Sequence, residues 1–114
     1  MLFAGACSGG TPTNATCPTT EAPTYADFGQ QFMTSYCTDC HSRTATNRHG
    51  APAGVDFDTE DDIVANASGI DETAAKGPGA TNTSMPAMSG PVHTAPSDDE
   101  RALLGQWLAC EMAK

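Results

Sequence analysis

Cys37-Thr38-Asp39-Cys40-His41 is the stretch of this 114-residue chain with the most specific chemistry, because it places two thiols and an imidazole within five residues. Two cysteines separated by two residues lie on one side of a turn, and the histidine follows at once. This pattern is typical of covalent haem attachment, in which both thiols add to the haem and the histidine binds its iron. Zinc sites and thioredoxin-like dithiols also use the Cys-x-x-Cys spacing.

The surroundings of the motif separate these possibilities. A structural zinc site needs four ligands, usually with a second Cys or His pair at short spacing, whereas Cys17 and Cys110 stand singly. A thioredoxin-like dithiol expects a strand before the motif, but apolar residues at helical spacing precede it here. We therefore predict one covalent haem c and its iron.

Length and charge limit the architecture and the partners. A chain of 114 residues has room for one domain with one small core. It has 5 Lys and Arg residues against 14 Asp and Glu residues, which gives a formal net charge of −9. Without a basic patch the chain is not expected to bind nucleic acid. A strongly negative surface is suited instead to a partner with a basic docking face.

The first 22 residues differ in composition from the rest. The chain begins with small and apolar residues, like the end of a signal peptide, and Ala4-Gly5-Ala6-Cys7 is similar to the lipobox of bacterial lipoproteins. Residues 8–16 are rich in Ser, Gly, Thr and Pro, which indicates a flexible tether. We predict a signal remnant and tether over residues 1–22 and a domain over residues 23–114. The predicted location is periplasmic or extracytoplasmic, with a lipid on Cys7 as a membrane anchor. The alternative for this cysteine is a spare thiol.

Helical patterns occupy three parts of the chain. Apolar residues at helical spacing predict a first helix over residues 24–40. Thr59 is a candidate cap for a second, short helix that begins near Glu60. Ser97 and Glu100 form a capping box ahead of the last helix.

The segments between these helices lack periodicity. Residues 42–56 and 77–90 are rich in Gly, Pro, Thr and Asn, and no alternating strand pattern is present. Loops this long are unusual in a small domain unless they surround something. The predicted fold is all-α, with helices and long loops wrapped around one covalent haem.

Over Tyr25–Met112 the chain resembles the class I monohaem cytochromes c. Beyond the motif, the resemblance rests on Gly29 and Phe32 in the first helix. It also rests on Leu104 and Trp107 in the last helix. In that family a small residue and an aromatic residue on the first helix cross the last helix at its own Leu and aromatic residue. The resemblance implies a small cytochrome c fold in which the N- and C-terminal helices cross.

The resemblance also implies roles for individual residues. Cys37 and Cys40 correspond to the thioether residues, and His41 corresponds to the proximal iron ligand. Pro52 stands where the family's loop proline offers its carbonyl to the other ring nitrogen of that histidine. Trp107 is a further candidate cofactor-binding residue, through its place on the terminal helix.

The sixth ligand and a partner for the haem propionates are left open. Met85-Pro86 resembles the ligand loop of the family, so Met85 is favoured, followed by Met88 and then His93. Arg48 is placed to bind a propionate through its guanidinium, and a solvated loop arginine is the alternative.

The single cysteines fit the same fold. Cys17 precedes the first helix and Cys110 lies near the end of the last helix. Since those helices cross in the assumed fold, we predict a disulfide between them, with two free thiols as the alternative.

A haem with both axial positions filled has no open site for a substrate, so we predict an electron-transfer protein and not an enzyme. It would carry single electrons between exported or membrane-associated redox partners. The alternatives are a haem subunit of a larger membrane redox complex, and a haem-based sensor or enzyme if the sixth ligand is labile.

Overall fold

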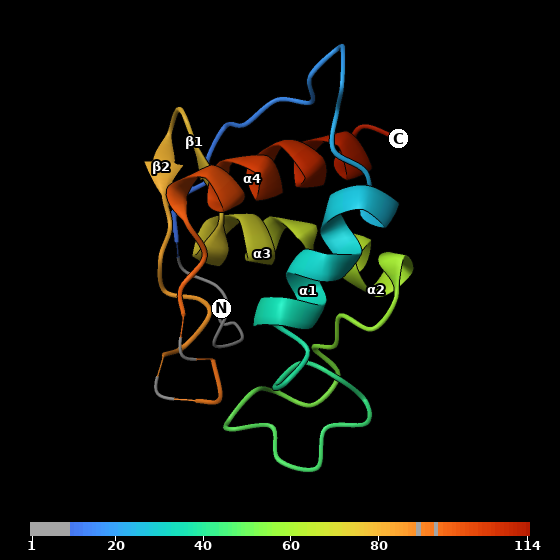
Figure 1. Cartoon of the computed structure of the whole chain (residues 1–114), viewed down its shortest axis with the longest axis vertical. Helices are drawn as coiled ribbons and strands as arrows, with labels where there is room; N and C mark the ends of the chain where they lie inside the picture. Colours follow the sequence, from blue (N-terminus) through green and yellow to red (C-terminus); the bar gives the residue numbers. More distant parts are fainter. Residues whose placement is uncertain (1–9, 89, 93) are drawn as a thin grey trace.

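Helices make up most of the regular structure (Figure 1). The computed structural model describes residues 10–88, 90–92 and 94–114. In chain order, the elements are a π-helical turn η1 (Tyr25–Gly29), α1 (Gln30–Tyr36), α2 (Glu60–Ala65), α3 (Ala67–Ala74), β1 (Lys76–Gly77), β2 (Ala80–Thr81) and α4 (Asp98–Met112). The strands pair antiparallel, with Lys76 opposite Thr81 and Gly77 opposite Ala80. The helix-rich class that the sequence predicts is confirmed. The short hairpin of β1 and β2 is the difference from an all-α fold.

Capping boxes set the helix starts that the sequence predicts. The Ser97 hydroxyl accepts a hydrogen bond from the Glu100 amide at 3.1 Å, and the Glu100 carboxylate accepts one from the Ser97 amide at 2.9 Å. Thr59 and Asp62 form the same reciprocal pair at the start of α2. These bonds satisfy amides that would otherwise lack partners in the first helical turn. The predicted starts of α2 and α4 are therefore confirmed.

The first helix is shorter than the sequence predicts. α1 ends at Tyr36, and the motif that follows forms a turn in which the His41 amide donates to the Cys37 carbonyl at 2.9 Å. The sequence pattern predicts neither α3 nor the hairpin. The buried face of α3 has helical spacing, but its members are small or polar apart from Ile70, so little hydrophobicity marks this helix in the sequence. Strands of two residues are too short to show alternation.

The core lies between α4 and the helices around it. Leu104, Trp107 and Leu108 of α4 are fully buried together with residues of α1, α2 and α3. Gly29 packs directly on the Trp107 indole, where a Cβ would come within 2.7 Å of the ring atom Cε2. Glycine permits this close approach. The predicted contact between the first helical segment and the last helix is thus present.

Part of the predicted tether packs against the domain. Thr13 is buried, and its amide and hydroxyl donate to the Asp71 carboxylate on α3 at 2.9 and 2.7 Å. The same segment passes so close to β1 that a Cβ at Gly77 would lie 2.6 Å from the Thr13 carbonyl oxygen. Around Thr13 the chain is therefore held against α3 and the hairpin.

The predicted disulfide is present. Cys17 and Cys110 are bonded, with a Cα–Cα distance of 4.6 Å, and they join the segment before η1 to the last helix. The predicted acylation site at Cys7 lies outside the described residues. Within residues 10–88, 90–92 and 94–114, none of the helices has both the length and the apolar character of a membrane span.

Candidate functional site

A mostly apolar cavity of about 240 Å³ opens between the end of α1, helix α3 and two loops. The loop after α1 and the loop before α4 lie on the same side of the helices (Figure 1). Predicted site residues that line the cavity are Cys37, Cys40, His41, Arg48, Pro52 and Met85. Residues separated by almost 50 positions in sequence thus meet at one site. Apolar side chains that the sequence analysis did not single out, such as Phe57 and Ile70, complete the walls.

The two cysteines of the motif lie in the turn after α1 and are half-buried. Neither belongs to the disulfide between Cys17 and Cys110. Burial raises the pKa of the Cys40 thiol, and the negative charge of Asp39 adds to this effect. A raised pKa keeps the Cys40 thiol protonated at neutral pH, which weakens it as a nucleophile for disulfide exchange.

His41 is buried and held in one orientation. Its Nδ1 atom is hydrogen bonded to the Val55 carbonyl at 2.8 Å, and its ring packs on Phe57 with 4.6 Å between ring centroids. Burial lowers the pKa of His41 and outweighs the opposing effect of the Val55 hydrogen bond. At neutral pH the imidazole is therefore neutral. With Nδ1 donating its proton to Val55, Nε2 carries the lone pair.

The carbonyl that accepts the hydrogen bond from His41 belongs to a different residue from the one expected. Pro52 was expected to supply it, but the acceptor is Val55, three residues later. The Pro52 carbonyl accepts instead from the Val55 amide at 3.2 Å and from Arg48 Nη2 at 2.7 Å. Gly54, with φ of +88°, lets the chain turn between these two residues. Pro52 still lines the cavity.

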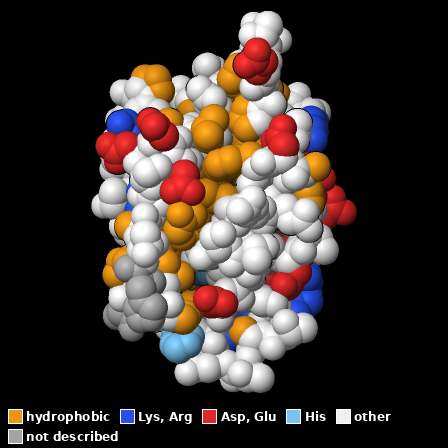
Figure 2. Space-filling model, viewed as in Figure 1, with side chains coloured by type: hydrophobic (Ala, Val, Ile, Leu, Met, Phe, Trp, Pro, Cys, Tyr) orange, Lys and Arg blue, Asp and Glu red, His pale blue; other side chains and the backbone are white. Residues whose placement is uncertain are grey.

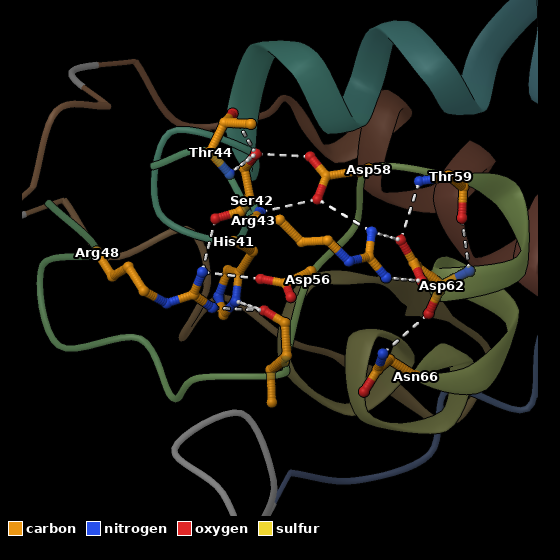
Figure 3. Close-up of polar contacts among 11 residues, drawn as sticks. His41, Ser42, Arg43, Thr44, Arg48, Asp56, Asp58, Thr59, Asp62 and Asn66 are labelled. Atoms are coloured by element: carbon orange, nitrogen blue, oxygen red, sulfur yellow. Dashed lines mark hydrogen bonds and ion pairs between the residues drawn. The ribbon is translucent and has the colours of Figure 1, made fainter. Parts of the chain in front are cut away.

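Arg48 holds together the loop that carries His41 (Figure 3). Its guanidinium donates to the carbonyls of Ser42 and Pro52, each at 2.7 Å, and to Val55 at 3.1 Å. It also forms an ion pair with Asp56 at 2.8 Å. The guanidinium therefore bonds chiefly to the loop, and neither alternative of the sequence analysis describes this role. Because carbonyl acceptors belong to the backbone, the sequence gives no sign of them.

A second arginine ties the same loop to α2. Arg43 Nη1 and Nη2 each lie 2.6 Å from the Asp62 carboxylate, and Arg43 also pairs with Asp58 at 3.4 Å (Figure 3). Asp58 in turn accepts from the Ser42 hydroxyl at 2.6 Å. Arg48 thus holds the loop after the motif together from within, and Arg43 ties the same loop to α2. The sequence analysis did not single out these contacts.

Met85 and Met88 differ in their surroundings. Met85 is half-buried in the cavity wall, where its amide donates to the Thr73 carbonyl at 2.9 Å. Met88 is 46% exposed and does not line the cavity. Met85 therefore lines the cavity and Met88 does not, while the choice of Met85 as a ligand stays a prediction. His93 lies outside the described residues.

Trp107 occupies a different place from the one expected. It does not line the cavity but lies at the contact between η1 and α4, beside Tyr25 and Phe28. Its Nε1 donates to the Glu111 carboxylate at 3.0 Å. Trp107 is therefore a core residue and not a cavity residue. Its spacing on α4 indicated burial correctly but carried no information about which part of the core it would occupy.

The predicted cofactor is contradicted by the arrangement of metal-binding side chains. A metal ion that is bound directly by the protein needs several His, Cys, Asp or Glu donors around one point. Among residues 10–88, 90–92 and 94–114, no three such side chains form a group that could hold a metal ion. On this observation, the prediction of one covalent haem c with its iron is wrong. The Cys-x-x-Cys-His spacing places two thiols and one imidazole in a cavity wall, but it does not assemble a set of metal donors.

Comparisons with known proteins give no match. No protein-family model matches the chain, and neither the curated proteins nor the solved structures provide a significant match. The function proposed below therefore rests on the cavity and on the residues that line it.

Proposed function

We propose that this chain is a small electron-transfer protein that carries single electrons between exported or membrane-associated redox partners. The fold that we propose with this function is that of the small cytochromes c, with η1 and α1 crossing α4. The observation that carries the proposal is the apolar cavity with Cys37, Cys40 and His41 in its wall. Such a cavity suits a flat, conjugated organic redox group with little water around it.

The two thiols supply a means of covalent attachment. A cysteine S–H can add across a carbon–carbon double bond of the group. The sulfur bonds to one carbon, the hydrogen goes to the other, and no oxidant is needed. Two such thioethers at Cys37 and Cys40 would fix the group along one edge of the cavity. Disulfide exchange is less well supported, because the pKa of Cys40 is raised.

The rest of the lining favours electron transfer over catalysis. None of the described residues that line the cavity is Asp or Glu, so no carboxylate is present there for acid–base chemistry. Of the two described histidines in the lining, His41 is buried and already bonded to the Val55 carbonyl, whereas His49 is exposed to solvent. A group enclosed by such walls exchanges electrons more readily than it exchanges atoms with a substrate.

The charge of the surface suits transient partners. The chain has a formal net charge of −9, and Figure 2 shows acidic side chains around an apolar strip on one face. Some of these acids cap helices, yet their summed field would still attract a partner with a basic docking face. A subunit of a larger membrane redox complex would have the same cavity chemistry, and co-purification with such a complex would identify it.

Intact mass and absorbance test the proposal. Protein exported by its natural host should keep an added mass after acid and organic extraction, and its visible absorption should change on reduction. A variant with Cys37→Ser and Cys40→Ser should lose both signals. A mass equal to that of the polypeptide with one disulfide would sink the proposal.

A further inference from the structure

Arg101 is a buried cation that joins α4 to the cavity wall. The residue is 3% exposed and lies in the first turns of α4. Its Nη1 atom donates to the carbonyls of Ala74 at 2.8 Å, Asn82 at 3.0 Å and Met85 at 2.9 Å. These acceptors come from the end of α3, the exit of β2 and the loop that lines the cavity. One guanidinium thus fixes three segments relative to one another.

Hydrogen bonds fix the backbone of Met85 at both its carbonyl and its amide. Its carbonyl accepts from Arg101, and its amide donates to the Thr73 carbonyl at 2.9 Å. Thr73 and Ala74 belong to α3 and line the same cavity. The position of Met85 in the wall therefore depends on Arg101 from α4 as well as on α3.

The charge of Arg101 is not neutralised by an ion pair. Within the described residues, its recorded partners are carbonyl oxygens, and it takes part in none of the salt bridges that the other basic residues form. Burial lowers its pKa, although Asp98 and Glu100 act in the opposite direction. An arginine stays protonated in spite of such a shift. A buried cation without a paired carboxylate is costly to fold, which indicates a role beyond stability.

We propose that Arg101 is a positioning residue that fixes Met85 in the cavity wall and places a permanent positive charge behind that wall. The charge favours the reduced form of a group held in the cavity, because reduction adds an electron close to it. The first part concerns the polypeptide alone, whereas the second part rests on the proposed function.

Amide hydrogen exchange tests the positioning role. Arg101→Gln removes the charge and most of the donors, so exchange at the Met85 amide should accelerate by roughly tenfold or more relative to the wild type. Arg101→Lys keeps a charge and a single nitrogen with several donors, so the increase should be smaller. Lys114→Gln removes an exposed cation that does not line the cavity, and it should leave Met85 unchanged. A folded Arg101→Gln protein with wild-type exchange at Met85 would overturn the proposal.

The midpoint potential tests the charge. Arg101→Gln should lower it, Arg101→Lys should restore most of the shift, and Lys114→Gln should change it little. Equal shifts in the Gln and Lys variants would overturn the electrostatic part. If the protein carries no redox group, the proposed function and the electrostatic part fail together, while exchange at Met85 still decides the positioning role. If Arg101→Gln does not fold, Arg101→Lys decides it, and unchanged exchange in that variant would contradict the proposal.

Discussion

Met85 and Met88 are identical side chains three residues apart, but only Met85 lines the cavity, so their replacement should have different effects. Met85→Ala would open the cavity wall to water, which stabilises the more highly charged form of an enclosed redox group, so the midpoint potential should shift. Met88→Ala is the matched control, because this side chain is 46% exposed and lies outside the lining. Voltammetry of both variants measures the shifts, and equal shifts would contradict the assignment of Met85.

Asp62 offers a test by pH. Its hydrogen bonds with Arg43 lower its pKa from 3.8 to about 2. The folded state therefore keeps this carboxylate charged where the unfolded chain has begun to protonate it. The contribution of the pair to stability is complete above pH 3.8 and is lost as the pH falls toward about 2. A carboxyl NMR titration should find the low pKa and a higher value in Arg43→Gln. Lys76→Gln, which removes the partner of Asp98, should leave the pKa of Asp62 unchanged.

At the scale of elements, the contact between η1 and α4 depends on a missing side chain. Gly29→Ala would press a methyl group into the Trp107 indole. Because neither the helical turn nor the buried ring can move freely, we expect a loss of about 1–3 kcal/mol in the free energy of unfolding. Gln30→Ala, at the exposed neighbouring position, should change it by less than about 0.5 kcal/mol. Urea unfolding followed by circular dichroism measures both, and equal stabilities would show that the contact yields easily.

The elements also show what a sequence can and cannot predict here. The helix starts at Glu60 and Asp98 follow from local capping pairs, which the sequence displays directly. The bond from His41 to Val55 depends on where a loop turns, and any residue could have supplied that carbonyl. The bonds of Arg101 are equally hidden from the sequence, because its partners are backbone oxygens of distant segments. Side-chain chemistry near the motif was therefore foreseeable, while its supporting backbone contacts were not.

The Cys17–Cys110 disulfide joins the two ends of the described chain and closes a span of 93 positions. A cross-link over so long a span restricts the unfolded chain, and the entropy model gives about 4.6 kcal/mol of stabilisation. A variant with Cys17→Ser and Cys110→Ser should lose about this much in urea unfolding, and reduced wild-type protein should behave in the same way. Peptide mapping without reduction should recover the linked pair. Free thiols at both positions in exported protein would contradict the pairing.

Trp107 gives the molecule an internal fluorescence probe. It is the chain's one tryptophan, and it is 1% exposed at the contact between η1 and α4. Its emission should lie at short wavelength in the folded protein and move to longer wavelength when that contact opens. A coloured group in the cavity would accept its excitation energy, so filled protein should emit weakly and empty protein brightly. One emission spectrum would therefore report both the state of this contact and the fraction of molecules whose cavity is filled.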